Sequence, residues 1–167
     1  MVKEDYLSQI PNNPQLADKN PSSFFLKYIV KLLNNLSLFV EPDIKLGQIS
    51  INHSYAARHE LMQKIIGIPS AFTGIDGDED VLIQFAKKYS HIEITQYDVV
   101  TKDAIVDFMN LHNGLFVVDL SKEDAIELSL EPPIYEDVDF ELALGNVATI
   151  PIQFTFGELL FFLIELD

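Results

Sequence analysis

The sequence predicts an α+β fold, in which helices pack on a mainly antiparallel sheet and the chain forms two helix-strand-helix halves over about 22–90 and 101–167. Two observations predict this class. Apolar residues at helical spacing open each half, and short apolar runs separated by Pro and Gly follow each opening helix. The runs succeed one another like hairpins, with few crossover connections, which favours antiparallel pairing. No residue-level repeat relates the two halves.

The first half should begin with a helix whose N-cap is Ser22 or Ser23. Apolar residues then recur at helical spacing for about four turns, and Pro42 stops the pattern. Strand-like runs and a second helix follow, the helix with acids in its first turn and lysines in its last, as the helix dipole prefers. The expected strands are 43–51, 60–69 and 70–76, and the expected helix is 78–90.

The second half should begin with a helix from Thr101 to about Leu120, followed by three strand-like runs. Gly157 marks a hairpin between the last two runs. The final run is apolar on both faces, which is typical of a central strand or of one buried at a subunit interface. The expected strands are 125–133, 147–157 and 158–166.

Composition narrows the function classes. A chain of 167 residues is the size of one domain, here expected over 21–167 behind a tail at 1–20. Eleven basic and 26 acidic residues give a formal charge of −15, which disfavours nucleic acid and anionic membrane surfaces as partners. There is no cysteine and no signal-like apolar run, and the longest apolar run, at 159–164, is too short to span a bilayer. We therefore expect a cytoplasmic protein.

The stretch "TKDAIVDFMNLHNG" at 101–114 carries four residues along one helix edge. With Asp103 set at zero and about 100° per residue, Asp107 lies near 40°, Asn110 near −20° and Gly114 near 20°. Many amphipathic helices carry such residues simply because that side faces water, so the stripe alone does not indicate a site. The opposite face should pack on the sheet and consists of Ile105, Phe108, Met109, Leu115 and Phe116.

The spacing continues beyond the helix. Three residues separate Asp103 from Asp107, two separate Asp107 from Asn110, and 22 separate Asn110 from Pro133. This resembles the signature of the CheC/CheX/FliY family of chemotaxis phosphatases: Asp or Ser, three residues, Glu, two residues, Asn, 22 residues and Pro. Gly114 also matches a glycine that commonly follows the Asn by four residues. The closing hairpin resembles that of the family, and one site per chain resembles the CheX-like branch.

The resemblance implies a CheC-like fold and a phosphatase that acts on a phosphorylated CheY-like receiver domain. Asn110 would orient water in line with the phosphorus, Asp107 would pair with the receiver's lysine, and Asp103 and Gly114 would shape the docking edge. Mg²⁺ is then expected on the receiver, with no cofactor bound by this chain. CheX-like members form dimers through the sheet, so a homodimer is expected as well.

The sequence departs from the family pattern in two places. The first departure leaves an alternative function open, and the second concerns the number of sites. Asp107 stands where the family has Glu and is one methylene shorter, and a misplacement of roughly 1 Å can cost about a hundredfold in rate. The alternative is a non-catalytic receiver-binding or scaffold module, with an unrelated small-molecule enzyme as a third reading. In the first half, Lys27 or Lys31 falls where a second site would need an acid, so one site per chain is expected.

Two other polar residues of the same helix, His112 and Asn113, are not expected to be catalytic. His112 falls amid the apolar face, which predicts a hydrogen-bonded histidine in the core or at its rim rather than a catalytic base. Asn113 lies beside the stripe, and we expect it to be solvated or to touch a partner. The four histidines are scattered along the chain, so no metal site is expected.

Overall fold

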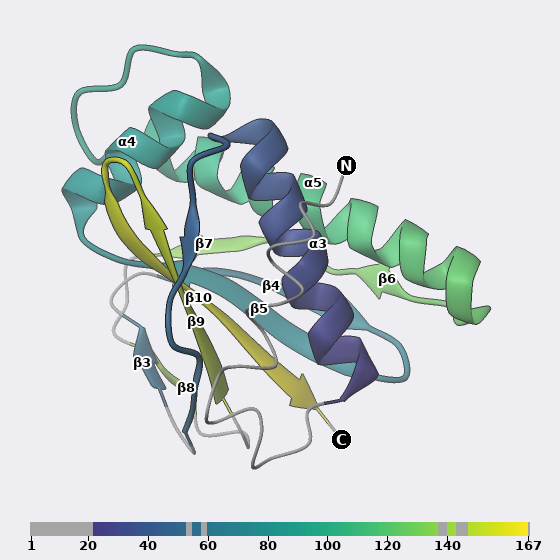
Figure 1. Cartoon of the computed structure of the whole chain (residues 1–167). Helices are drawn as coiled ribbons and strands as arrows, with labels where there is room; N and C mark the ends of the chain where they lie inside the picture. The colour runs from purple at the N-terminus through teal and green to yellow at the C-terminus, as the bar shows by residue number, and fades with distance from the viewer. Residues whose placement is uncertain (1–21, 53–54, 58–59, 137–139, 143–146, 167) are drawn as a thin grey trace.

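The computed structural model describes residues 22–52, 55–57, 60–136, 140–142 and 147–166, and Figure 1 shows their arrangement. The predicted tail at 1–20 and the first residue of the predicted domain lie outside this part of the chain. Its helices are α3 (Ser23–Phe39), α4 (Glu79–Ser90) and α5 (Val99–Asp124). Its strands are β1 (Lys45–Leu46), β2 (Ser50–Asn52), β3 (Tyr55–Ala57), β4 (Glu60–Ile66), β5 (Ser70–Asp76), β6 (Ser129–Leu130), β7 (Ile134–Glu136), β8 (Phe140–Leu142), β9 (Val147–Phe154) and β10 (Gly157–Leu166).

The described strands form one large sheet and one small one, and every pairing is antiparallel. The order in the large sheet is β1-β9-β10-β5-β4-β6, with β2 also paired to β9 and β7 to β4. Strands β3 and β8 make the small sheet. The predicted α+β class with a mainly antiparallel sheet is therefore confirmed.

The last two strands form the predicted hairpin around Gly157. This glycine has a φ of 138°, and a Cβ there would lie 2.8 Å from Val81 Cγ2, so both backbone and space favour glycine. Strand β10 lies between β9 and β5, which confirms that the run that is apolar on both faces is a central strand. Leu163, for example, is opposite Ala148 on one side and Thr73 on the other.

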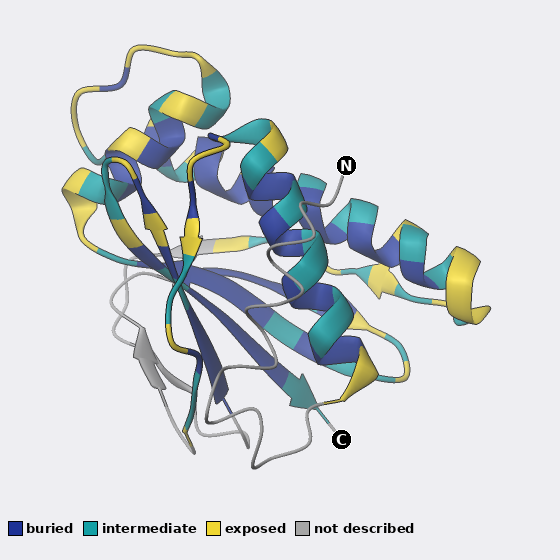
Figure 2. Ribbon diagram, viewed as in Figure 1, coloured by how far each residue is buried: buried dark blue, intermediate teal, exposed yellow. Residues whose placement is uncertain are grey.

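The helices pack on one face of the large sheet, and their buried sides meet it in the core (Figures 1 and 2). Helix α3 starts where predicted, because Ser22 accepts a hydrogen bond from the Phe25 amide at 3.1 Å. Aromatic rings join the layers, and Phe85 of α4 meets Phe108 of α5 edge-on at 5.2 Å. Fully buried core residues include Ile29, Leu32, Leu33, Ile65, Ile105 and Ile150.

Helix α5 is longer than predicted. It begins at Val99 behind a capping box, in which Asp98 accepts from the backbone of Thr101. It ends at Asp124, before Ala125 adopts a left-handed φ of 54°. The predicted strand at 125–133 therefore shrinks to β6, and the second half closes on β10 with no described helix after its strands. Lys27 of α3 forms ion pairs with Glu123 and Asp124 in the last turn of α5, beyond the predicted end of the helix.

Candidate functional site

The predicted polar edge lies along α5. Asp103, Asp107 and Asn110 are all exposed, and Gly114 is half-buried. The opposite side of the helix packs into the core, where Phe108 is fully buried. Asp103 makes no hydrogen bond or ion pair with the rest of the described chain, so its carboxylate is open to solvent or to a partner. The spacing thus predicted correctly which side of the helix faces solvent.

A tyrosine from the end of α4 holds Asp107. The Tyr89 hydroxyl donates to Asp107 Oδ2 at 2.7 Å, and the Tyr89 ring meets Phe108 edge-on at 5.4 Å. Burial, and then the hydrogen bond to the Asp107 carboxylate, raise the pKa of Tyr89 above its ordinary value. The phenol therefore stays protonated and acts as a donor. The other oxygen of Asp107, Oδ1, has no partner among the described residues.

A glutamine from the sheet holds Asn110. The Gln63 side chain is 1% exposed, and its Nε2 donates to Asn110 Oδ1 at 2.8 Å and to the Glu131 carbonyl at 2.9 Å. The expectation that Asn113 is solvated is wrong. Asn113 is fully buried, and its Nδ2 donates to Gln63 Oε1 and to Thr73 Oγ1, each at 2.9 Å. Asn110 is consequently the exposed end of a buried polar chain.

Gly114 and Pro133 border the same region. A Cβ built on Gly114 would be nearest to Leu130 Cδ1, at 4.0 Å, so packing within the chain does not require glycine there. Pro133 is half-buried and directly precedes β7, which pairs with β4. It is two residues beyond Glu131, whose carbonyl accepts from Gln63. The segment that contains Pro133 is therefore hydrogen-bonded, through Glu131, to Gln63, the residue that holds Asn110.

His112 is a core histidine, as predicted. Its ring is 1% exposed, its Nδ1 lies 2.9 Å from Asn35 Nδ2, and it stacks on Phe108 with 5.9 Å between ring centroids. Burial, and then the nearby charge of Lys31, lower its pKa to about 3. The ring is therefore neutral near pH 7. It faces the core, away from the exposed edge, and cannot serve that edge as a base.

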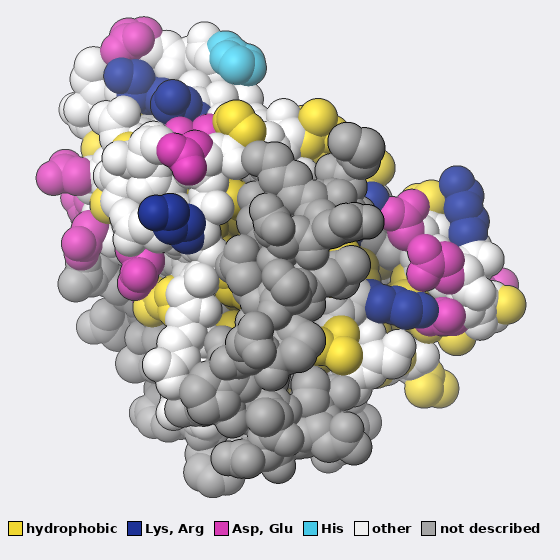
Figure 3. Space-filling model, in the orientation of Figure 1, with side chains coloured by type: hydrophobic (Ala, Val, Ile, Leu, Met, Phe, Trp, Pro, Cys, Tyr) yellow, Lys and Arg dark blue, Asp and Glu magenta, His cyan; other side chains and the backbone are white. Residues whose placement is uncertain are grey.

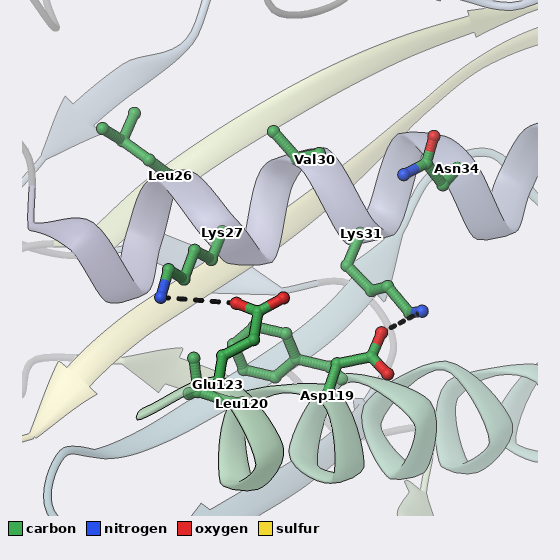
Figure 4. A pocket seen from close by; sticks show the side chains of 9 residues that line it. Leu26, Lys27, Val30, Lys31, Asn34, Asp119, Leu120 and Glu123 are labelled. Atoms are coloured by element: carbon green, nitrogen blue, oxygen red, sulfur yellow. Dashed lines mark hydrogen bonds and ion pairs between the residues drawn. The ribbon is translucent and has the colours of Figure 1, made fainter. Parts of the chain in front are cut away.

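The matching positions of α3 do not present a second acidic edge. Lys27 binds Asp124 at 2.9 Å and Glu123 at 3.5 Å, and Lys31 pairs with Asp119, so both lysines tie α3 to α5 (Figure 4). Figure 3 shows acidic and basic side chains side by side over the C-terminal end of α5. A cavity of about 520 Å³ lies between the two helices beside these pairs.

Among the described residues, no group of three or more His, Asp or Glu side chains is arranged to hold a metal ion. No helix in this part of the chain combines the length and apolar character needed to cross a membrane.

The sequence matches no protein-family model and no curated protein. Solved structures, in contrast, match over most of their length. A CheX chemotaxis protein from Desulfovibrio desulfuricans superposes with a TM-score of 0.70 and 17% identity, over 86% of this chain and 99% of that one. The chain has the fold of the CheX and CheC-like chemotaxis proteins. A CheC-like superfamily protein from Shewanella sp. PV-4 gives a TM-score of 0.71 with 15% identity, over 86% and 97% of the two chains.

A third structure with this CheX-like fold is a complex of CheX with CheY, BeF3 and Mg²⁺ from Borrelia burgdorferi. Its TM-score is 0.68 with 13% identity, over 87% of this chain and 99% of that one. At such identities the likeness establishes the fold, and the site has to be argued from the residues of this chain. Tyr89 and Gln63, which hold the two central site residues, were not predicted from the sequence. Gln63 could have been found from the sequence, because it is a polar residue at a core-facing position of an otherwise apolar strand.

Proposed function

We propose that this protein docks the α5 edge on a phosphorylated CheY-type receiver domain in the cytoplasm and promotes hydrolysis of its aspartyl phosphate. A water oxygen bonds to phosphorus, the bond from phosphorus to the receiver's aspartate breaks, and inorganic phosphate leaves. Asn110 positions the water, Asp107 pairs with the receiver's lysine, and Asp103 and Gly114 shape the docking edge. Mg²⁺ belongs to the receiver. Phosphoryl transfer of this kind depends mainly on positioning and charge placement.

One observation carries the proposal: the spaced residues share an exposed helix edge, yet Asn110 and Asp107 are each held by a hydrogen bond from another element. An amide suits the role at Asn110 because it donates and accepts without titrating. Val100 and Val118, 43% and 47% exposed, lie five helical turns apart on the same side and flank the polar residues with apolar contact area. The CheX–CheY complex with the same fold supports a receiver as partner.

The direct test is the decay of phosphorylated receivers. A panel of CheY-type receivers is phosphorylated with a small phosphodonor in Mg²⁺, and release of phosphate is followed with and without this protein. We expect faster release for at least one receiver. Identical decay for every receiver would sink the phosphatase proposal. The protein should also be sized by light scattering, because the proposed homodimer would carry two α5 edges per particle.

The second candidate, a module that binds a receiver without hydrolysis, is favoured by one observation. The shorter Asp107 already gives one of its two oxygens to Tyr89. In that case the wild type binds receivers but leaves their phosphate decaying as fast as in the receiver alone, and Asp107→Glu, which extends the carboxylate by roughly 1 Å, is expected to speed this decay by up to about a hundredfold. Single-turnover decay with both proteins measures this gain. Wild-type protein that releases receiver phosphate faster than the receiver does alone would exclude this candidate.

Gly114→Ala separates folding from docking. Glycine inside a helix costs about 0.5–1 kcal/mol relative to alanine, and a Cβ fits at this position. The variant should therefore be more stable than the wild type by that amount in urea unfolding. It should nevertheless bind the receiver more weakly, by about tenfold (about 1.4 kcal/mol), because a Cβ would hold the receiver's backbone away. Titration with a receiver in BeF3 and Mg²⁺ measures this.

The matched control is Asn34→Ala on α3, which also raises helix propensity but lies beside the cavity, away from the edge. It should leave receiver affinity unchanged. Unchanged affinity in Gly114→Ala as well would show that no partner backbone approaches the edge there.

A further inference from the structure

One buried side chain joins three parts of the fold at the α5 edge. Gln63 occupies a helix-facing position of β4, between two apolar core positions. Its Nε2 donates to Asn110 Oδ1 and to the carbonyl of Glu131, and its Oε1 accepts from Asn113 Nδ2. At 1% exposure it cannot reach a partner protein itself. Gln63 can therefore affect a bound partner only through the residues that it holds, and of these Asn110 is the one on the exposed α5 edge.

The backbone carbonyls of Glu131 and Gln63 fix which end of each side-chain amide donates and which accepts in this hydrogen-bond network. The Glu131 carbonyl can only accept, so the end of Gln63 that faces it is the donor Nε2. The Thr73 hydroxyl donates to the backbone carbonyl of Gln63 at 3.2 Å, so Thr73 Oγ1 is left to accept from Asn113 Nδ2. Gln63 Oε1 then meets Asn113, and Asn110 turns Oδ1 inward. The atoms that Asn110 presents outward are consequently the Nδ2 hydrogens and the second lone pair of Oδ1.

The segment with the motif proline supports the same geometry. Glu131 precedes Pro132, and the residue before a proline is restricted to extended conformations. The Glu131 amide also donates to the Lys64 carbonyl at 3.0 Å, which fixes this segment to β4 beside Gln63. The Glu131 carbonyl is thus held in place from both sides. It in turn holds the donor end of Gln63.

We propose that Gln63 is the positioning residue for Asn110, an inference that rests on the proposed function. Gln63 restrains the exposed amide to one orientation, with its free hydrogens and lone pair turned toward the attacking water. Without Gln63, Asn110 would sample several rotamers and both amide orientations, and most of these would not align the water with phosphorus. Asn113 and Thr73 act one step further back, because they hold Gln63.

Gln63→Met tests this inference, because methionine keeps the length of the side chain and removes both the donor and the acceptor of its amide. We expect kcat for receiver dephosphorylation to fall about tenfold to a hundredfold, with KM for the receiver within about twofold. In an Asn110→Ala background the same change should have no further effect. Equal fractional losses in both backgrounds would overturn the proposal, since Gln63 would then act by another route.

A second readout does not need catalysis. The ¹⁵N relaxation of the Asn110 side-chain amide should report an ordered group in the wild type and a mobile one in Gln63→Met. Equal order in both proteins would overturn the proposal, even if the variant lost activity. If the wild type hydrolyses no receiver phosphate, the proposed function fails, while a loss of amide order in the variant still supports the positioning role.

Thr149→Val is the control for a loosened core. It removes a buried hydroxyl of β9 that donates to the Ser50 carbonyl, and β10 and β5 separate β9 from the β4 strand of Gln63. Its kcat should stay within about twofold of wild type, and a loss as large as that of Gln63→Met would contradict the proposal. Gln63→Asn, whose shorter amide cannot reach Asn110 in the same way, replaces Gln63→Met if that variant fails to fold. The same loss of order at Asn110 is expected from it.

Discussion

Asn110→Ala is expected to slow phosphate release from the receiver by about a hundredfold, while receiver affinity stays within about twofold. Asn110 is exposed on α5 and fixed at Oδ1 by Gln63. Alanine preserves the helix, because it has the highest helix propensity, but it removes the amide that would hold the water. Single-turnover decay of the phosphorylated receiver measures the rate, and titration in BeF3 and Mg²⁺ measures the affinity.

Two further variants show whether the amide itself matters. Asn110→Asp keeps the size and an acceptor for Gln63, but it loses both N–H donors and brings a negative charge toward the phosphoryl group, so it should be as slow as Asn110→Ala. Asn34→Ala removes an amide from α3 and should keep the wild-type rate. If Asn110→Ala hydrolysed at the wild-type rate, the role of Asn110 in positioning water would be lost, and the edge would at most bind.

Local patterns were sufficient for the fold class, for the starts of the first two helices, for the closing hairpin and for the exposed edge, but not for the length of α5 or of the strand that follows it. The 3.6-residue period placed Asp103, Asp107 and Asn110 on the outer side of α5, because the apolar residues between them had to face the core. The run of apolar residues on both faces indicated a central strand or one buried at a subunit interface, and β10 lies between β9 and β5. In each case the deciding physics is the burial of apolar surface, which a short window of sequence records.

Long-range polar contacts could not be predicted in this way. Asn113 lies at the flank of the α5 stripe, where periodicity alone suggests water, yet it is buried against Gln63 and Thr73, 50 and 40 residues away in the sequence. A usable signal did exist. Gln63 and Thr73 are polar residues at core-facing positions of neighbouring strands and are paired directly across the sheet. Two such residues facing a helix indicate a buried polar network, because burial without partners costs free energy.

His112 is expected to make the protein about 2 kcal/mol less stable at pH 5 than at pH 7, over and above the effect of its carboxylates. Its ring is buried, with Nδ1 accepting from Asn35 and Nε2 left without a partner among the described residues. Burial, then the charge of Lys31, lower its pKa from 6.5 to about 3. Between these values the unfolded chain binds a proton that the folded protein does not. The stabilisation is therefore complete above pH 6.5 and is lost as the pH falls toward 3.

Urea unfolding at pH 7 and pH 5 isolates this contribution when the wild type is compared with His112→Asn. Asparagine keeps an acceptor near the position of Nδ1 but does not titrate, so the variant should lose about 2 kcal/mol less between the two pH values, whatever its stability at pH 7. The many carboxylates respond alike in both proteins and cancel. His91→Asn is the control, because His91 is exposed at the end of α4 with a φ of 59°, which asparagine tolerates. The same pH dependence in the wild type and in His112→Asn would mean that the folded protein protonates this ring, and hence that the inner face of α5 is open to water.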